Sequence, residues 1–370
     1  MKTFTTFDRP GGWSAIGDAF CDDLAAGHRI QLAPWGGLAI LGHSELMALS
    51  RDPSADGMAP SAEAMADTPR IYELLMRSVF TKSGAAHRTD RAALVAALGM
   101  ADVPGVIRRC VAEALPVSAN ALPIRDGLVA PIVRAVWASI AGYDACGAER
   151  LERAVQEMGY ILSPAPDLSK ASIAEAAAAE TAELSYAAVQ RGSVFSRVLA
   201  ETVGHRRAAD LIAGMAFDAI ETSITGLTGA LRIAALNADR LVPTAQCANE
   251  CLRLASPAPM TMRLSTDAMS VGGVEIEPGT ALSMIWAAGN HDPAAFPDPR
   301  RFNPARSGAR PLTFGMGQHA CLGHGIVRGV MQELLAFWIA RSPRLSGDTG
   351  VWNILMPSDM PEISLSWAGA

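Results

Sequence analysis

The sequence has little charge and no long apolar run. Of its 370 residues only 18% are charged, whereas half are hydrophobic, so the chain can bury a large core. Its net charge of −6 argues against a nucleic-acid binder, because phosphate neutralisation needs clustered Lys and Arg. No window holds the roughly 18 consecutive apolar residues that a membrane span needs, so we expect none.

Signals for secretion and for a disulfide framework are lacking too. The start, MKTFTTFDRPGGWSAIGDAF, contains no unbroken apolar stretch of the kind found in signal peptides. Six cysteines are scattered along the chain without framework spacing. Reduced thiols in a cytoplasmic protein are the plain interpretation.

The order of apolar patterns predicts a mainly α protein with a small β region. Residues 28–42 alternate around turn glycines as a hairpin does, and residues 260–290 are also rich in strand patterns. Between about residues 71 and 233 apolar residues recur at helical spacing, and residues 210–231 are apolar nearly all round, as in a buried helix. A closing hairpin is predicted within residues 353–367. Because no repeat or linker divides the chain, we expect one domain over residues 1–370.

One cysteine stands in an unusual setting, the stretch TFGMGQHACLGHGIVRG at residues 313–329. A zinc site could use His319, Cys321 and His324, but structural zinc takes four ligands and no second pair is evident. A nucleophilic thiolate could be stabilised by the helix that follows, yet that leaves the Phe-Gly-x-Gly pattern unexplained. A buried inert thiol explains none of the glycines.

A thiolate bound to haem iron explains the whole pattern. Glycines let the backbone approach a porphyrin face, a helix start points N–H groups at the sulfur, and a cation can meet a propionate. Chance would match these spaced residues on the order of once in a hundred million start positions. The matching residues are Phe314, Gly315, Gly317, His319, Cys321 and Gly323.

This loop closely resembles the haem-binding loop of the cytochrome P450 family, of the soluble bacterial type. The resemblance implies that family's fold, a triangular helical prism with haem b (iron protoporphyrin IX) between its I and L helices. Cys321 would be the axial ligand of the iron, and Phe314, Gly315 and Gly323 would line the haem. Four further residues resemble the family's propionate partners: His87, Arg91, Arg263 and His319.

Glu250 and Arg253 look like the Glu-x-x-Arg of the family's K helix, one turn apart. The family adds a third partner from an irregular stretch before the cysteine loop, and Arg301 in PDPRRF resembles it. Buried, such a cluster requires further hydrogen bonds. The resemblance therefore assigns Glu250, Arg253 and Arg301 a structural role behind the haem.

Two registers compete on the central helix, where the family carries an acid and a threonine over the iron. In the first, Glu221 and Thr222 take these places and keep the acid–alcohol pair, which predicts ordinary oxygen activation. In the second, which fits the spacing to Glu250 better, Ala216 and Phe217 take them. Peroxide use, coupling, dehydration or rearrangement would then replace hydroxylation. The chemistry favours the first register and assigns Glu221 and Thr222 as catalytic.

The resemblance implies a monooxygenase that inserts one oxygen atom from O2 into a small, mostly apolar substrate. Since 370 residues hold no flavin or iron–sulfur domain, electrons from NAD(P)H would arrive through a separate ferredoxin and ferredoxin reductase. Arg306, Arg310 and Arg328 are candidates for the docking face. The segments expected to line the pocket, residues 60–80, the central helix, 256–260 and 356–360, predict an apolar cavity without an ionic anchor.

Overall fold

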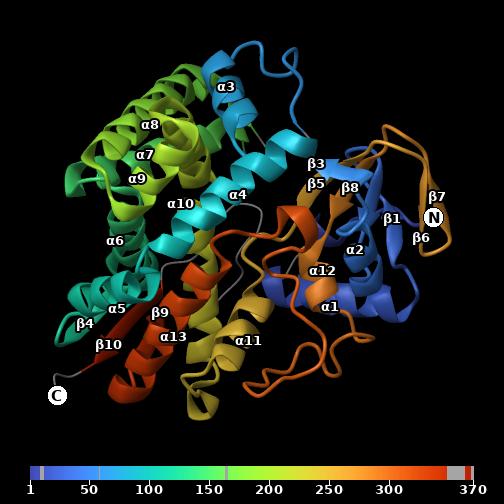
Figure 1. Ribbon diagram of the computed structural model, residues 1–370. Helices are drawn as coiled ribbons and strands as arrows, with labels where there is room; N and C mark the ends of the chain where they lie inside the picture. The colour runs from blue at the N-terminus through green and yellow to red at the C-terminus, as the bar shows by residue number, and fades with distance from the viewer. Residues whose placement is uncertain (9–11, 58, 163–165, 348–362, 368–370) are drawn as a thin grey trace. The chain divides into compact units, whose positions relative to one another are not determined.

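The structure is a computed structural model that describes residues 1–8, 12–57, 59–162, 166–347 and 363–367 (Figure 1). The chain forms two compact units, each assembled from separate stretches of sequence. Unit 1 comprises residues 1–58, 117–125 and 225–370, and unit 2 comprises residues 59–116 and 126–224. Every described strand lies in unit 1, and unit 2 is helical in the part that the structure describes.

A five-stranded sheet of order β1-β2-β8-β5-β3 forms the centre of unit 1. Its first two strands are the predicted hairpin, in which Ile30 lies opposite Ile40. Strand β2 then runs parallel to β8, while β5 is antiparallel to both β8 and β3. The strands are β1 Ile30–Leu32, β2 Leu38–Ile40, β3 Ala55–Gly57, β5 Thr261–Ser265 and β8 Ala281–Met284.

Two smaller sheets complete the strands of unit 1. Strands β6 (Met269–Val271) and β7 (Val274–Ile276) form a hairpin. Strand β10 (Ile363–Trp367) lies between β4 (Ala119–Pro123) and β9 (Arg344–Gly347), antiparallel to both. The predicted closing hairpin at residues 353–367 thus has its last strand in β10, and the rest of that prediction lies outside the described residues.

Helices of unit 1 pack on the main sheet through two apolar clusters. One cluster gathers Phe4, Ile16 and Phe20 against Leu41, and the other packs Leu46 and Leu312 against Ile40. The helices are α1 Gly12–Ala25, α2 His43–Leu49, α11 Ala245–Ala255, α12 Trp286–Asn290 and α13 His324–Arg341, with 3-10 turns at Thr6–Asp8, Ala238–Arg240 and Gly317–His319.

Unit 2 is a set of helices in which α7 and α8 pack along each other (Figure 1). Tyr143, before α7, is buried and shares a 2.7 Å hydrogen bond with Ser185 of α8. Its helices are α3 Pro69–Arg77, α4 Gly84–Met100, α5 Val103–Ala114, α6 Ala130–Ala141, α7 Ala145–Leu162, α8 Ala171–Arg191 and α9 Val194–Val203, with a 3-10 turn at Leu168–Lys170. A π-helical turn, Ile124–Val129, precedes α6.

The longest helix, α10, spans His205–Ala235 and has residues in each unit. It contains the apolar run that predicted a buried helix, and residues 211–216 and 224–231 are indeed buried. A single 3-10 turn separates its end from α11.

The prediction of a mainly α fold with a small β region is confirmed. The hairpin at residues 28–42 and the strands of residues 260–290 are present, whereas β3 and β4 were not predicted. A single domain over residues 1–370 stays a prediction. Among the described residues, no helix combines the length and apolar character needed to cross a bilayer.

Candidate functional site

The loop before α13 presents the Cys321 side chain at the surface of unit 1. Its shape is fixed by a hydrogen bond from the Cys321 N–H to the Phe314 carbonyl, 2.9 Å, which closes the loop on itself. Three residues later α13 begins, and the His324 ring nitrogen is bonded to the Cys321 carbonyl at 3.1 Å. The thiol therefore lies just before a helix N-terminus, where the macrodipole favours an anion such as a thiolate.

Gly317 shows why the loop needs glycine. Its φ is +71°, and an added Cβ would lie 1.7 Å from the Ser50 carbonyl oxygen. Any side chain there would both strain the backbone and push the loop off the end of α2. Gly315 also has a positive φ, and its Cα faces Trp286, whose indole donates to Thr261 at 2.9 Å.

A buried amide that sequence reasoning did not assign holds the start of the loop. The Asn290 side chain donates to Ser256 at 3.1 Å and to Thr313 at 3.2 Å, and its oxygen accepts from the Leu312 N–H at 2.7 Å. Asn290 is fully buried. Its place in Asn-His-Asp-Pro, one residue after a glycine and far from the cysteine in sequence, gave no sign of this contact.

Arg263 on β5 is a buried cation without a carboxylate partner in the described ranges. The residue is 6% exposed, and its guanidinium donates to the Met262 carbonyl at 3.0 Å. Burial lowers the pKa of Arg263 to about 10, and the charge of Asp56 only partly offsets this. A buried arginine without an ion pair is expensive, so the site favours an anionic ligand.

His319 approaches the same strands. Its ring nitrogen lies 3.4 Å from an oxygen of Asp56 on β3, and the side chain is 3% exposed. Asp56 and Arg263 lie on paired strands, where Gly57 faces Arg263. Unit 1 therefore gathers Arg263 and His319 near one carboxylate, in the same unit as Cys321.

His87 and Arg91 lie one turn apart on α4 in unit 2. His87 is 1% exposed and Arg91 is partly buried, so neither is an ordinary exposed polar side chain. At spacing i, i+4 the two share a face of the helix.

The third member of the Glu250 cluster is a different arginine from the predicted one. Arg253 donates to both oxygens of Glu250, at 2.8 and 2.9 Å, and to the Asn290 carbonyl at 2.6 Å. Arg306, not Arg301, supplies the second cation, with Nε 3.0 and 3.2 Å from the two Glu250 oxygens. Arg306 also donates to the carbonyls of Pro297, Asp298 and Arg301, which folds the irregular segment around its side chain.

The prediction for Arg301 is therefore wrong, because its side chain is exposed. Both arginines stand in a proline-rich stretch where no helical or strand period ties sequence spacing to position. The prediction that Arg306 belongs to a docking face is also wrong, because its side chain is only 10% exposed and is bound to Glu250. Arg310 is exposed and Arg328 is partly exposed.

The middle of α10 contains one stretch that the rest of the protein does not fully bury. Between the buried stretches, residues 217–223 are partly or fully exposed except for Ile220, and Thr222 is the exposed one. The Thr222 hydroxyl donates to the Asp218 carbonyl at 2.5 Å, one turn back. Glu221 and Phe217 are partly buried, and Ala216 is fully buried.

A family model described as "Cytochrome P450" matches residues 233–341, the segment that holds the Glu250 cluster, the main-sheet strands after α11 and the cysteine loop. Over this segment the chain is similar to the cytochrome P450 family.

Curated P450 relatives match over a stretch of similar length. The putative cytochrome P450 140 of Mycobacterium bovis is 41% identical over 95 residues, which are 25% of this chain and 22% of the relative. The biotin biosynthesis cytochrome P450 of Bacillus subtilis is 36% identical over 97 residues, 26% of this chain and 25% of the relative. The 6-deoxyerythronolide B hydroxylase of Saccharopolyspora erythraea is 34% identical over 108 residues, which are 28% of this chain and 27% of the relative. The chain thus spans about a quarter of these relatives' length.

Solved P450 structures share the fold along nearly the whole chain. P450BioI in complex with an acyl carrier protein has a TM-score of 0.84 at 20% identity, covering 95% of this chain and 97% of its own. CYP108D1 of Novosphingobium aromaticivorans has a TM-score of 0.81 at 21% identity, and the match covers 97% of this chain and 95% of CYP108D1. The P450 fold therefore extends well beyond the segment matched in sequence.

The residues of this site fit a haem. Its porphyrin would bring two carboxylates, the anions that the buried Arg263 lacks, and the exposed Cys321 thiol stands where a thiolate is stabilised. A zinc site is less well supported than a haem site, because no group of three or more potential zinc ligands occurs in the described part of the chain.

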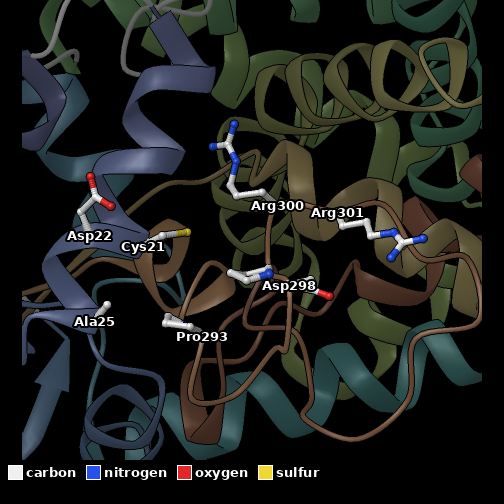
Figure 2. A pocket seen from close by; sticks show the side chains of 8 residues that line it. Cys21, Asp22, Ala25, Pro293, Asp298, Arg300 and Arg301 are labelled. Carbon is white, nitrogen blue, oxygen red and sulfur yellow. The ribbon is translucent and has the colours of Figure 1, made fainter.

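A surface groove of unit 1 lies away from these haem-site residues. Cys21, Asp22 and Ala25 of α1 face residues 293–301 across it, and the Arg301 side chain points away from Cys21 (Figure 2). Burial raises the pKa of the Cys21 thiol, which is bonded to the His291 carbonyl at 3.4 Å. A thiol with a raised pKa is a poor nucleophile, so Cys21 is not a candidate for nucleophilic catalysis.

Proposed function

We propose that this protein is a haem–thiolate monooxygenase that inserts one oxygen atom from O2 into a small, mostly apolar substrate. The observation that carries the proposal is the Cys321 loop, with its thiol exposed before α13 and its backbone fixed by Gly317. Haem with a thiolate ligand supplies the activation of O2, because the thiolate pushes electron density towards O–O cleavage.

In this proposal the Cys321 thiolate would bind the haem iron, and the surrounding residues would hold the haem b. The propionate partners stay those that the sequence indicates, namely Arg263, His319, His87 and Arg91. Phe314, Gly315 and Gly323 would line the haem on the side of the loop. The Glu250 cluster, through Arg253 and Arg306, holds the chain behind the loop rigid.

Glu221 and Thr222 are proposed to hold and move protons near the reacting atoms. Three features support this register over the one with Ala216 and Phe217. Thr222 is the exposed residue in the open stretch of α10, whereas Ala216 is fully buried.

Gly214, the glycine of the rival register, faces protein. A Cβ added to it would lie 2.8 Å from the Ser78 Cβ, so the missing side chain makes room for Ser78 rather than for oxygen. The first register leaves fewer residues between its motif and Glu250, and the structure accommodates this because a single 3-10 turn stands between α10 and α11.

Electrons are proposed to come from NAD(P)H through a separate ferredoxin reductase and ferredoxin. Arg310 and Arg328 remain candidates for the docking face, because both are at least partly exposed. An acidic ferredoxin surface would be steered to such a face, and its rate of electron transfer would fall with ionic strength.

The proposal is tested by turnover with heavy-isotope O2. The haem-loaded protein, supplied with a ferredoxin, its reductase and NADPH, is screened against small apolar compounds for product. We expect one heavy oxygen atom in the product, as measured by mass spectrometry. Product whose oxygen comes only from water, or product formed with peroxide but never with O2, would contradict the proposal.

A further inference from the structure

Asp218 on α10 is a carboxyl group without a cation. Among the described residues its side chain has one hydrogen bond, a long one of 3.5 Å from the Ser78 hydroxyl. The charged groups of the segments around it are engaged elsewhere: Arg77 pairs with Asp210 and Glu73, and Lys82 and Arg207 pair with Asp90. Asp218 lies one turn before Thr222, within the open stretch of α10.

The Ser78 hydroxyl is held in place for this contact. Gly214, one turn before Asp218, lets the Ser78 Cα and Cβ come within 3.0 and 2.8 Å of where a Cβ would be. The Ser78 oxygen accepts from the Phe80 N–H at 3.2 Å, and its hydroxyl donates to Asp218. Gly214, Ser78 and Asp218, all within unit 2, together form this polar contact.

The surroundings of Asp218 disfavour its charge. Burial raises the pKa of Asp218 to about 7, and the Ser78 hydrogen bond only partly offsets this effect. No charged group contributes to the shift. Asp218 is only partly exposed, and a carboxylate largely withdrawn from water without a cation is costly, so a cation brought by a ligand would supply the missing partner.

The neighbours of this pair suit a ligand that is apolar apart from one cation. Phe80, two residues after Ser78, is 38% exposed, and Phe217 beside Asp218 is partly exposed. Aromatic faces attract cations and also accommodate hydrocarbon. Ser78 and Asp218 both fall in segments predicted to line the pocket, where the sequence indicated no ionic anchor.

We propose that Asp218, oriented by Ser78, is the specificity-determining anchor for a substrate that carries a cationic amine on a mostly apolar body. The inference rests on the proposed monooxygenase function, since it names the substrate class of that same site. The anchor forms an ion pair with the amine and thereby fixes which end of the substrate lies beside Thr222.

The test measures binding by calorimetry in the haem-loaded protein. The probes are octyltrimethylammonium, octan-1-ol and octanoate, which share one hydrocarbon chain and differ in charge. A quaternary ammonium cannot ligate iron, so its binding reports on the anchor alone. The variants are Asp218→Asn, which keeps the size of the side chain and removes its charge, and Ser78→Ala, which removes the orienting hydroxyl.

We expect the wild type to bind the cation most tightly and octanoate least. Asp218→Asn should lose about tenfold in affinity for the cation, with octan-1-ol unchanged, and Ser78→Ala should lose less. Equal affinity of the wild type for cation and alcohol, no binding of the cation, or an equal loss for both probes in Asp218→Asn would overturn the proposal. Calorimetry detects binding without turnover, so failure of the anchor is distinct from failure of the monooxygenase function.

Discussion

Arg306 places its Nε 3.0 Å from one oxygen of Glu250 and 3.2 Å from the other, opposite the bidentate contact that Arg253 makes with the same carboxylate. Glu250 is 2% exposed, so its charge depends on these two arginines and on the Asn303 N–H at 3.0 Å. The contact joins α11 to the irregular segment that leads to the cysteine loop.

Arg306→Ala should therefore destabilise the protein strongly. Removing one partner from a buried ion pair leaves charge uncompensated, and we expect a loss of about 3 kcal/mol in the free energy of unfolding. Urea unfolding measures it. Arg301→Ala is the matched control, because it removes an exposed arginine from the same segment and should change stability little. A larger loss for Arg301→Ala would show that the pairing is wrong.

Gly317→Ala should distort the cysteine loop. The added methyl would meet the Ser50 carbonyl oxygen and would also require a positive φ, at a cost of about 1–3 kcal/mol from strain alone. We expect the variant to bind haem less completely, as measured by the ratio of haem absorbance to protein. Gly325→Ala serves as control, because no atom lies within 4 Å of its added Cβ. Equal haem content in both variants would refute this role of Gly317.

Thr222→Ala should uncouple the enzyme. Without the hydroxyl, proton supply near the reacting atoms becomes disordered, so NADPH consumption should continue while product per NADPH falls at least several-fold. Thr222→Ser, which keeps the hydroxyl, should restore most of the coupling. Unchanged turnover and coupling in Thr222→Ala would favour the register with Phe217 over the iron, and with it non-hydroxylating chemistry.

Stability should depend on pH through Asp218. Its pKa is raised to about 7 in the folded protein from 3.8, so between these values the folded state holds a proton that the unfolded state has lost. The free energy of unfolding therefore falls as pH rises from about 4 to 7, by up to about 4 kcal/mol from this group. In Asp218→Asn this contribution should vanish. Chemical denaturation at about pH 5 and pH 8 compares the two, and identical pH dependence would contradict the assignment.

The sequence was informative where residue spacing is tied to regular structure or to a compact loop. The pair Glu250 and Arg253 contact each other because one helical turn separates them. Cys321 could be singled out because its glycines are needed by the backbone itself, as the close approach of Gly317 to Ser50 shows.

Other parts depend on contacts between segments distant in sequence, which no local pattern encodes. Arg306 and Arg301 could not be told apart, since both lie in an irregular stretch. The bridge from Asn290 to Thr313 and the contact of Ser78 with Gly214 and Asp218 bring together residues that lie on separate helices and loops. Strands β3 and β4 are short, and their pairing partners lie far along the chain.

The central claim, thiolate ligation of haem by Cys321, is tested most directly by the absorption spectrum of the reduced protein with carbon monoxide. The account predicts the long-wavelength Soret band of a thiolate-ligated haem in the wild type and in Cys146→Ala, which removes another exposed cysteine. It predicts loss of that band in Cys321→Ala. Absence of the band from the wild type, or its survival in Cys321→Ala, would contradict the account.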